Sequence, residues 1–145
     1  TIERISGNAR DDGEWHSWTA SDDLVPSSRY ALMLFAMGKP TAMGRSVFFS
    51  IGARVAVSVN SKDIDNGESV TIRWQTEGLD DTRLRLDLVD QADNVVQALG
   101  TTNDGATQIN WNVNTTSVLR QARVRATSLV ASEVEGFSEW FDLNR

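Results

Sequence analysis

The sequence predicts an all-β protein, and two observations lead to that prediction. From Arg54 to Arg145, apolar and polar residues alternate in one short segment after another, as in strands with one buried face. Clusters of Asp, Asn and Gly separate these segments at fairly regular spacing, as turns between strands require. We therefore expect a two-layer β-sandwich over residues 54–145, preceded by a β-rich segment over residues 1–53.

Seven short strands are expected in the second region. Val70, Ile72 and Trp74, for example, alternate with polar residues, so their side chains share one face of a strand. The expected core holds about twenty apolar side chains, each contributing about 1.5–3 kcal/mol when buried, which is enough for an independent domain. Residues 91–94 are expected to form a hairpin turn. The expected strands lie at residues 54–59, 70–75, 83–88, 95–96, 108–113, 121–128 and 136–143.

Three segments of this region resemble strands of fibronectin type III domains and related immunoglobulin-like modules. Residues 69–74 (Ser-Val-Thr-Ile-Arg-Trp) are similar to the second strand of such domains, where a Trp fills the core. Residues 122–126 (Ala-Arg-Val-Arg-Ala) and 137–140 (Phe-Ser-Glu-Trp) are similar to the last two strands. The resemblance covers residues 54–145 and implies an Ig-like sandwich, of a kind also found on bacteriophage virions and cell surfaces.

The first 53 residues show apolar side chains on both faces of their expected strands. We expect strands at residues 30–37 and 45–52 with a turn at residues 38–44, and a helix over residues 28–38 is the alternative. A segment this short cannot bury both faces by itself, so the sandwich, another copy of the chain or a different protein must cover it. The predicted assembly interface consists of Tyr30, Met33, Phe35, Met37, Phe48 and Phe49.

Arginines gather on outward positions of the last strands. The strands that carry Arg85 and Arg123 are neighbours in an Ig-like topology, and Trp140 is expected to stack on these arginines as a cation–π partner. The predicted surface patch is Arg85, Arg123, Arg125 and Trp140. It is interpreted either as an intramolecular ladder of side chains or as a docking patch for an acidic partner.

No convincing catalytic or metal site is predicted. The chain has one histidine and no cysteine, so neither a catalytic triad nor a thiolate or histidine metal site can be assembled. Residues 63–68 fit a solvated turn better than a calcium loop, and adjacent aspartates such as Asp80 and Asp81 fit exposed loops better than a glycosidase pair. Trp15 and Trp18 fit packing better than ligand stacking, and ligand stacking is kept as the alternative. We expect no cofactor and no enzymatic activity.

Net charge excludes some of the remaining classes of function. A net charge of −6 argues against a nucleic-acid or membrane-surface role. We expect a structural protein that binds sister copies or a capsid or tail protein, and the resemblance to Ig-like modules of phage surfaces implies a bacteriophage capsid decoration or tail accessory protein. No signal peptide pattern opens the sequence, so assembly in the host cytoplasm is expected. The alternative is a secreted or cell-surface module that binds carbohydrate or mediates adhesion.

Overall fold

The computed structural model describes residue 5, residues 17–115 and residues 118–145. Every regular element in this part of the chain is a strand, which confirms the all-β prediction. The N-terminal strands are β1 (Ser27–Tyr30), β2 (Met33–Ala36), β3 (Lys39–Arg45) and β4 (Phe49–Ile51). They are followed by β5 (Arg54–Val59), β6 (Asp63–Ile64), β7 (Ser69–Glu77), β8 (Leu84–Val89), β9 (Val95–Thr101), β10 (Gln108–Asn112), β11 (Leu119–Ser128), β12 (Glu135–Phe137) and β13 (Phe141–Leu143). Among the described residues no helix is long and apolar enough to cross a membrane.

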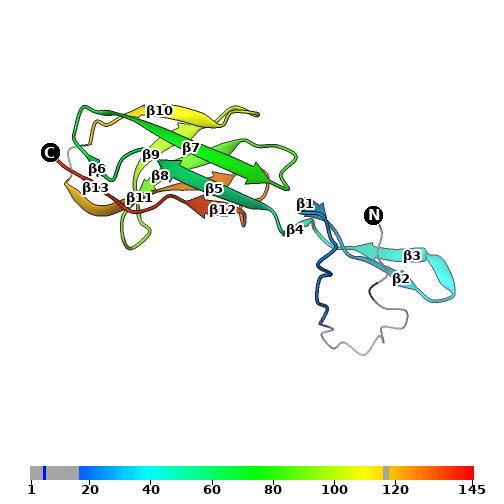
Figure 1. The fold of residues 1–145 in the computed structure, drawn as a ribbon. Helices are drawn as coiled ribbons and strands as arrows, with labels where there is room; N and C mark the ends of the chain where they lie inside the picture. The colour runs from blue at the N-terminus through cyan, green and yellow to red at the C-terminus, as the bar shows by residue number, and fades with distance from the viewer. Residues whose placement is uncertain (1–4, 6–16, 116–117) are drawn as a thin grey trace.

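Strands β5 to β13 form two sheets that lie face to face (Figure 1). One sheet is antiparallel with the order β10–β7–β5. The other has the order β6–β13–β11–β8–β9, and β12 pairs with the C-terminal part of β11. The short β6 runs parallel to β13, while the other pairs in this sheet are antiparallel. The predicted two-layer arrangement of this region is therefore present.

The core lies between the two sheets and follows the alternation of the sequence. In β7, Ile72 and Trp74 are 0% and 3% exposed, whereas Arg73 between them is exposed. Gly136 of β12 lies close against the backbone of Val55 in β5, because a Cβ atom at position 136 would collide with the Val55 carbonyl oxygen. Other buried core residues are Ile64, Val70, Leu84, Leu86, Leu88, Trp111, Val113, Ala122, Val124, Ala126, Phe141 and Leu143.

The last expected strand, residues 136–143, is divided in the structure. β12 ends at Phe137 and β13 begins at Phe141. Between them, the Ser138 backbone N–H donates to the Val124 carbonyl oxygen (2.9 Å), and the Ser138 hydroxyl oxygen accepts from the Val124 N–H (2.9 Å). A side-chain oxygen thus replaces a backbone partner in the ladder, so the chain bends here while its hydrogen bonds are kept.

The N-terminal region differs from the expected pair of long strands. The apolar run at residues 30–37 is split, because β1 ends at Tyr30 and pairs with β4, whereas β2 begins at Met33 and pairs with β3. The turn expected at residues 38–44 is only two residues long, Met37 and Gly38, and β3 occupies the rest. Gly38 makes this tight turn accessible, since its φ of 76° is in the left-handed region. The alternative helix over residues 28–38 is wrong.

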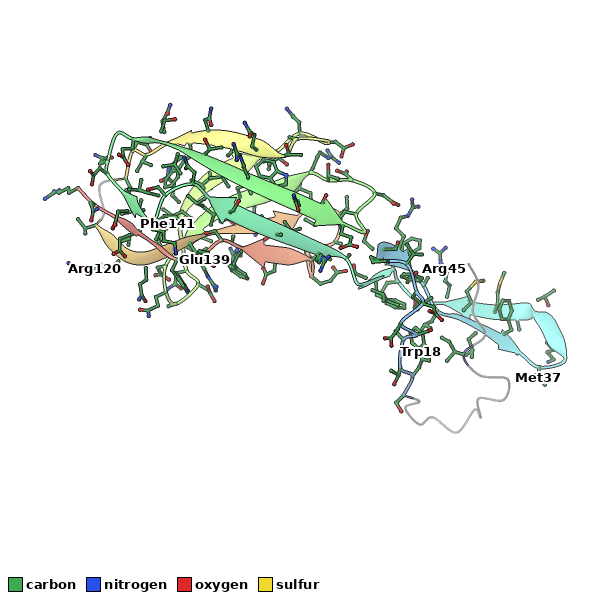
Figure 2. All side chains as sticks on the ribbon, in the orientation of Figure 1. Trp18, Met37, Arg45, Arg120, Glu139 and Phe141 are labelled. Atoms are coloured by element: carbon green, nitrogen blue, oxygen red, sulfur yellow. The ribbon has the colours of Figure 1, made fainter. Side chains whose placement is uncertain are left out.

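This region has two parts, the neck and the arm. The neck consists of residues 25–31 and 46–53, which include β1 and β4 and join the sandwich. The arm is the hairpin of residues 32–45, which comprises β2, the Met37–Gly38 turn and β3. Figure 1 shows the arm projecting away from the sandwich, and Met37 lies at its tip (Figure 2).

Candidate assembly surface

The arm exposes large apolar side chains that the sandwich leaves uncovered. Met33 and Phe35 of β2 are 51% and 56% exposed, and Met37 at the tip is 79% exposed. Leu34, on the opposite face of the same strand, is 67% exposed, and Met43 of β3 is 65% exposed. Both faces of the hairpin are therefore apolar and open. The sandwich, the first of the three candidates expected from the sequence to cover them, does not.

Cross-strand pairing decides which arm residues share a face. Met33 pairs with Arg45, and Phe35 pairs with Met43, so these four side chains gather on one face. Leu34 pairs with Gly44, which leaves Leu34 with no side chain opposite it on the other face. The register shifts between Phe35 and Ala36, because Ala36 pairs with Lys39, and this shift makes a bulge in β3.

The neck is packed more closely than the arm. Tyr30 and Phe49 are half-buried, and their ring centroids lie 6.4 Å apart in a tilted arrangement, which is within the range of favourable aromatic pairs. The Tyr30 hydroxyl donates to the Val25 carbonyl oxygen at 2.7 Å. These two predicted interface residues thus stabilise the base of the arm, whereas Met33, Phe35 and Met37 present its surface.

Phe48 occupies an electropositive part of the neck. It is 51% exposed, and the guanidinium carbons of Arg29 and Arg45 lie 5.8 Å and 5.0 Å from its ring centroid, within cation–π range. Residues 24–53 contain three basic residues and no Asp or Glu. The arm and neck are thus basic and apolar in a chain whose net charge is −6.

Several contacts join the neck to the sandwich. The Ser28 backbone N–H donates to the Gly78 carbonyl oxygen at 2.9 Å, and Arg29 forms an exposed ion pair with Asp80 at 3.1 Å. The Ser50 hydroxyl donates to Oε1 of Glu133 at 2.6 Å, and this hydrogen bond holds the pKa of that carboxyl below its usual value. The neck, from which the arm projects, is thus attached to the sandwich by hydrogen bonds and an ion pair.

Sequence reasoning missed part of this surface. Leu34 and Met43 are more exposed than Met33, and Val47 in the neck is 85% exposed. Leu34 belongs to the same apolar run as Met33 and Phe35, so its place on this surface could have been predicted from the sequence. Met43 lay in a segment that was expected to be a turn, where an apolar residue does not indicate a sheet face.

The arginine patch predicted on the sandwich forms a set of internal contacts. The guanidinium carbon of Arg123 lies 3.8 Å from the Phe137 ring centroid and 4.3 Å from the Trp140 ring centroid. Nη2 of Arg123 also donates to Oδ1 of Asp93 at 2.7 Å. The Arg123 side chain is only 20% exposed as a result. This guanidinium is stacked and paired within the molecule, and Phe137 is a partner that sequence reasoning did not identify.

Asp87 lies on the outer face of β8, yet it is buried. Its side chain is 4% exposed, because Arg85 and Arg125 both reach its Oδ2 atom, at 3.0 Å and 3.2 Å. Arg125 stands directly opposite Asp87 in the β8–β11 ladder, and its side chain is 18% exposed. The carboxylate is buried on the outer face of the sheet under the two guanidinium groups that neutralise it.

Trp18 and Trp140, two of the tryptophans proposed for ligand stacking, lie on different parts of the molecule. Trp15 lies outside the described residues. Trp18 is half-buried and lies beside the neck, while Glu139, the sequence neighbour of Trp140, lies on the sandwich (Figure 2). Trp140 is 38% exposed, and Arg123 stacks on its ring. Binding of a polysaccharide at any of these residues stays a prediction.

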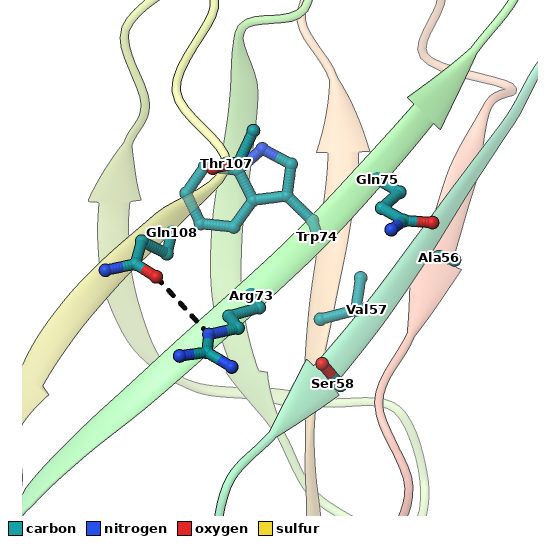
Figure 3. Close-up of a pocket in the computed structure, with 8 residues that line it drawn as sticks. All are labelled: Ala56, Val57, Ser58, Arg73, Trp74, Gln75, Thr107 and Gln108. Atoms are coloured by element: carbon teal, nitrogen blue, oxygen red, sulfur yellow. Dashed lines mark hydrogen bonds between the residues drawn. The ribbon is translucent and has the colours of Figure 1, made fainter.

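The sandwich also carries an open hollow, shown in Figure 3. It has a volume of about 620 Å³ and lies over β5, β7 and the start of β10. Nε of Arg73 donates to Oε1 of Gln108 at 3.3 Å across part of it. No carboxylate or histidine lines the hollow; its lining residues are Ala56, Val57, Ser58, Arg73, Trp74, Gln75, Thr107 and Gln108. It therefore offers neither a general acid nor a general base for catalysis.

The acidic side chains do not form a reactive group. Hydrogen bonds from Arg83 hold the pKa of Asp81 below its usual value, which is opposite to the raised pKa of a glycosidase acid. Asp80, its neighbour, pairs with Arg29 of the neck. In the part of the chain that the structure describes, no cluster of three or more acidic or histidine side chains is placed to hold a metal ion.

Comparison of the chain with protein-family models gave no matching family, and comparison with curated proteins gave no significant match.

Proposed function

We propose that this chain is a non-enzymatic assembly protein, specifically a bacteriophage capsid decoration or tail accessory protein. Its arm anchors it to sister copies or to a capsid or tail protein, and its sandwich is displayed outward. The observation that carries the proposal is the arm itself, a hairpin with apolar side chains exposed on both faces and no cover from the sandwich. Soluble monomers rarely expose such surface unless it is an interaction site.

The size of the exposed surface supports an interface with another protein. Eight large apolar side chains within residues 32–48 are 43–85% exposed. Apolar patches larger than about 300–600 Å² are rare on soluble monomers outside interaction sites. The eight residues are Leu32, Met33, Leu34, Phe35, Met37, Met43, Val47 and Phe48.

The proposal also takes the sandwich to be an Ig-like or fibronectin III-like module. The strand order supports this, since β5, β7 and β10 occupy the positions of strands A, B and E. β9, β8, β11 and β13 then occupy the positions of strands C′, C, F and G in the facing sheet. Such a module has its own core and needs nothing from the arm, which leaves the arm free to bind a partner.

Sedimentation of particles tests the proposal. Virions released by the host that carries this gene are purified on a density gradient, and the chain is detected by antibody in each fraction. We expect the chain in the particle fractions, and we expect the Met33→Asp and Phe35→Asp variants in the soluble fraction, because a buried unpaired charge opposes docking. Val95→Asp and Val96→Asp, at exposed apolar positions of β9, are the matched controls and should remain with the particles. Absence of the wild-type chain from all particle fractions would overturn the proposal.

A further inference from the structure

The two edges of the arm differ in a way that indicates how it pairs. The β3 edge carries Lys39 and Arg45, a bulge and Pro40, which has no backbone N–H. Charged side chains, prolines and bulges are the devices by which proteins protect an edge strand from pairing. The β2 edge, Met33–Ala36, has none of them. Among the described strands, β2 pairs with β3 alone, so no described strand occupies its other edge, which we call the open edge.

The hydrogen bonds of the hairpin fix which backbone groups face this open edge. The Ser46 N–H donates to the Leu32 carbonyl oxygen at 2.9 Å. In an antiparallel pair such hydrogen-bonded positions recur at every second residue, so the backbone groups of Leu32 and Leu34 point toward β3. The N–H and C=O groups of Met33 and Phe35 therefore point away from it, toward the open edge.

We propose that two copies of this chain pair through this edge, β2 against the partner's β2, antiparallel and around a two-fold axis at Leu34. This inference rests on the proposed assembly function and names sister copies as the partner of the β2 edge. Met33 then pairs with the partner's Phe35 and Phe35 with the partner's Met33, which satisfies all four open groups of each copy. Leu34 meets the partner's Leu34 in a non-hydrogen-bonded pair on the opposite face.

Charge favours this pairing over the other symmetric choice. β2 contains no ionisable residue, so two copies of it meet without repulsion. Two copies of β3 paired around Ala42 would place Lys39 opposite the partner's Arg45, and like charges opposite each other destabilise a ladder. A lipid surface would cover the apolar side chains but would leave the open N–H and C=O groups unpaired. A second β-strand would cover the apolar side chains and would also pair the open N–H and C=O groups.

The resulting ribbon has four strands, with β3 of each copy on the outside. Because the β2 strands are antiparallel, the two sandwiches lie at opposite ends of the ribbon. The Met37 tip of one copy reaches the neck of the other, beside the partner's Ala31. The two broad faces of the ribbon stay open, and they remain available for the particle that the proposed function requires.

Cysteine cross-linking tests the pairing, and the chain is suited to it because it has no cysteine of its own. Residues in a non-hydrogen-bonded pair have Cα atoms about 4.5 Å apart, within the range that a disulfide spans. We expect Leu34→Cys to form a disulfide-linked dimer on oxidation. Ala42→Cys, on the exposed outer strand, is the control, and its thiols would lie three strand spacings apart, too far for a bond. The paired thiol should react at least about tenfold faster, because pairing raises its effective concentration.

A second variant measures the association without a cross-link. Leu34→Lys would place two ammonium groups side by side at the two-fold axis, so we expect a monomer in sedimentation equilibrium, while Ala42→Lys stays dimeric. Far-UV circular dichroism checks that the sandwich of each variant is folded. Equal cross-linking of Leu34→Cys and Ala42→Cys, or a wild-type monomer, would overturn the β2 pairing. If Met33→Asp still released the chain from particles in that case, the proposed function would stand and only the identity of the partner would change.

Discussion

The guanidinium carbon of Arg123 lies 3.8 Å from the ring centroid of Phe137. Trp140 provides a second ring at 4.3 Å, and Asp93 accepts a hydrogen bond from the same guanidinium. One side chain thus links β11 with β12, the connection to β13 and the turn after β8. We expect the contacts of this cation to stabilise the sandwich.

Replacement of Arg123 measures that contribution. We expect Arg123→Met to lower the free energy of unfolding by about 1–3 kcal/mol, since a partly desolvated cation–π contact contributes up to about 2 kcal/mol and Asp93 loses its partner. Arg73→Met is the control, because Arg73 is exposed and touches Gln108 alone among the polar contacts described; its change should stay within about 0.5 kcal/mol. Urea unfolding followed by tryptophan fluorescence measures both. Equal losses would contradict a special role for the stack.

The buried carboxylate of Asp87 gives a larger expected effect. Asp87→Ala leaves the guanidinium of Arg125, which is 18% exposed, without its carboxylate, and loss of one member of a buried ion pair costs about 3 kcal/mol or more. Arg125→Ala should cost less than Asp87→Ala, because the Arg85 guanidinium still neutralises the Asp87 carboxylate. In a double-mutant cycle the two changes together should cost less than their sum, because they remove one shared interaction. Strict additivity in urea unfolding would show that the pair is not coupled.

Much of the sandwich could be predicted from the sequence, because its strands have one buried face. The alternation around Ile72 and Leu86 marks that face directly, and both residues are fully buried. Asp87 shows the limit of the pattern. Alternation indicates the face on which a residue lies, but it does not show that Arg85 and Arg125 cover that face.

The N-terminal region was predicted less well for a physical reason. When both faces of a strand are apolar, as in Met33–Ala36, the pattern contains no change of face and cannot locate a break. The break near Ala31 and the tight turn at Gly38 depend on the pairing of β1 with β4 and of β2 with β3. The need for a partner could be predicted from the apolar composition. The open edge of β2 could be identified only from the register of the β2–β3 pairing.

Substitution of two glycines distinguishes the cost of backbone strain from an effect on the position of the neck. Gly78 and Gly105 both have positive φ values, 70° and 76°. A Cβ atom on Gly78 would lie 2.7 Å from the Pro26 carbonyl carbon, whereas one on Gly105 would meet nothing within 4 Å. Both Ala substitutions should cost about 1 kcal/mol from backbone strain. Gly78→Ala should in addition displace the neck.

Limited proteolysis detects that displacement. We expect faster cleavage within residues 25–31 of Gly78→Ala, since the hydrogen bond from Ser28 to Gly78 is lost when the neck moves. Gly105→Ala should keep the wild-type cleavage rate in this segment. Identical rates in the two variants would mean that the neck is not held by its contact with Gly78.

Acid should weaken the attachment of the neck through Glu133. The Ser50 hydroxyl is the main cause of the lowered pKa of Glu133, followed by its own backbone N–H. A carboxyl whose pKa is lower in the folded state stabilises that state at pH values above its usual pKa of 4.5, and the contribution is lost as the pH falls through the lowered pKa. Ser50→Ala removes the donor, so the pKa of Glu133 should rise toward the usual value. An NMR titration of the Glu133 carboxyl carbon measures this shift, with Ser58→Ala, a change on the exposed face of β5, as the control. If Ser50→Ala left the titration curve unchanged, the hydrogen bond would not be the cause of the lowered pKa, and the neck would lose no stability at acid pH through this contact.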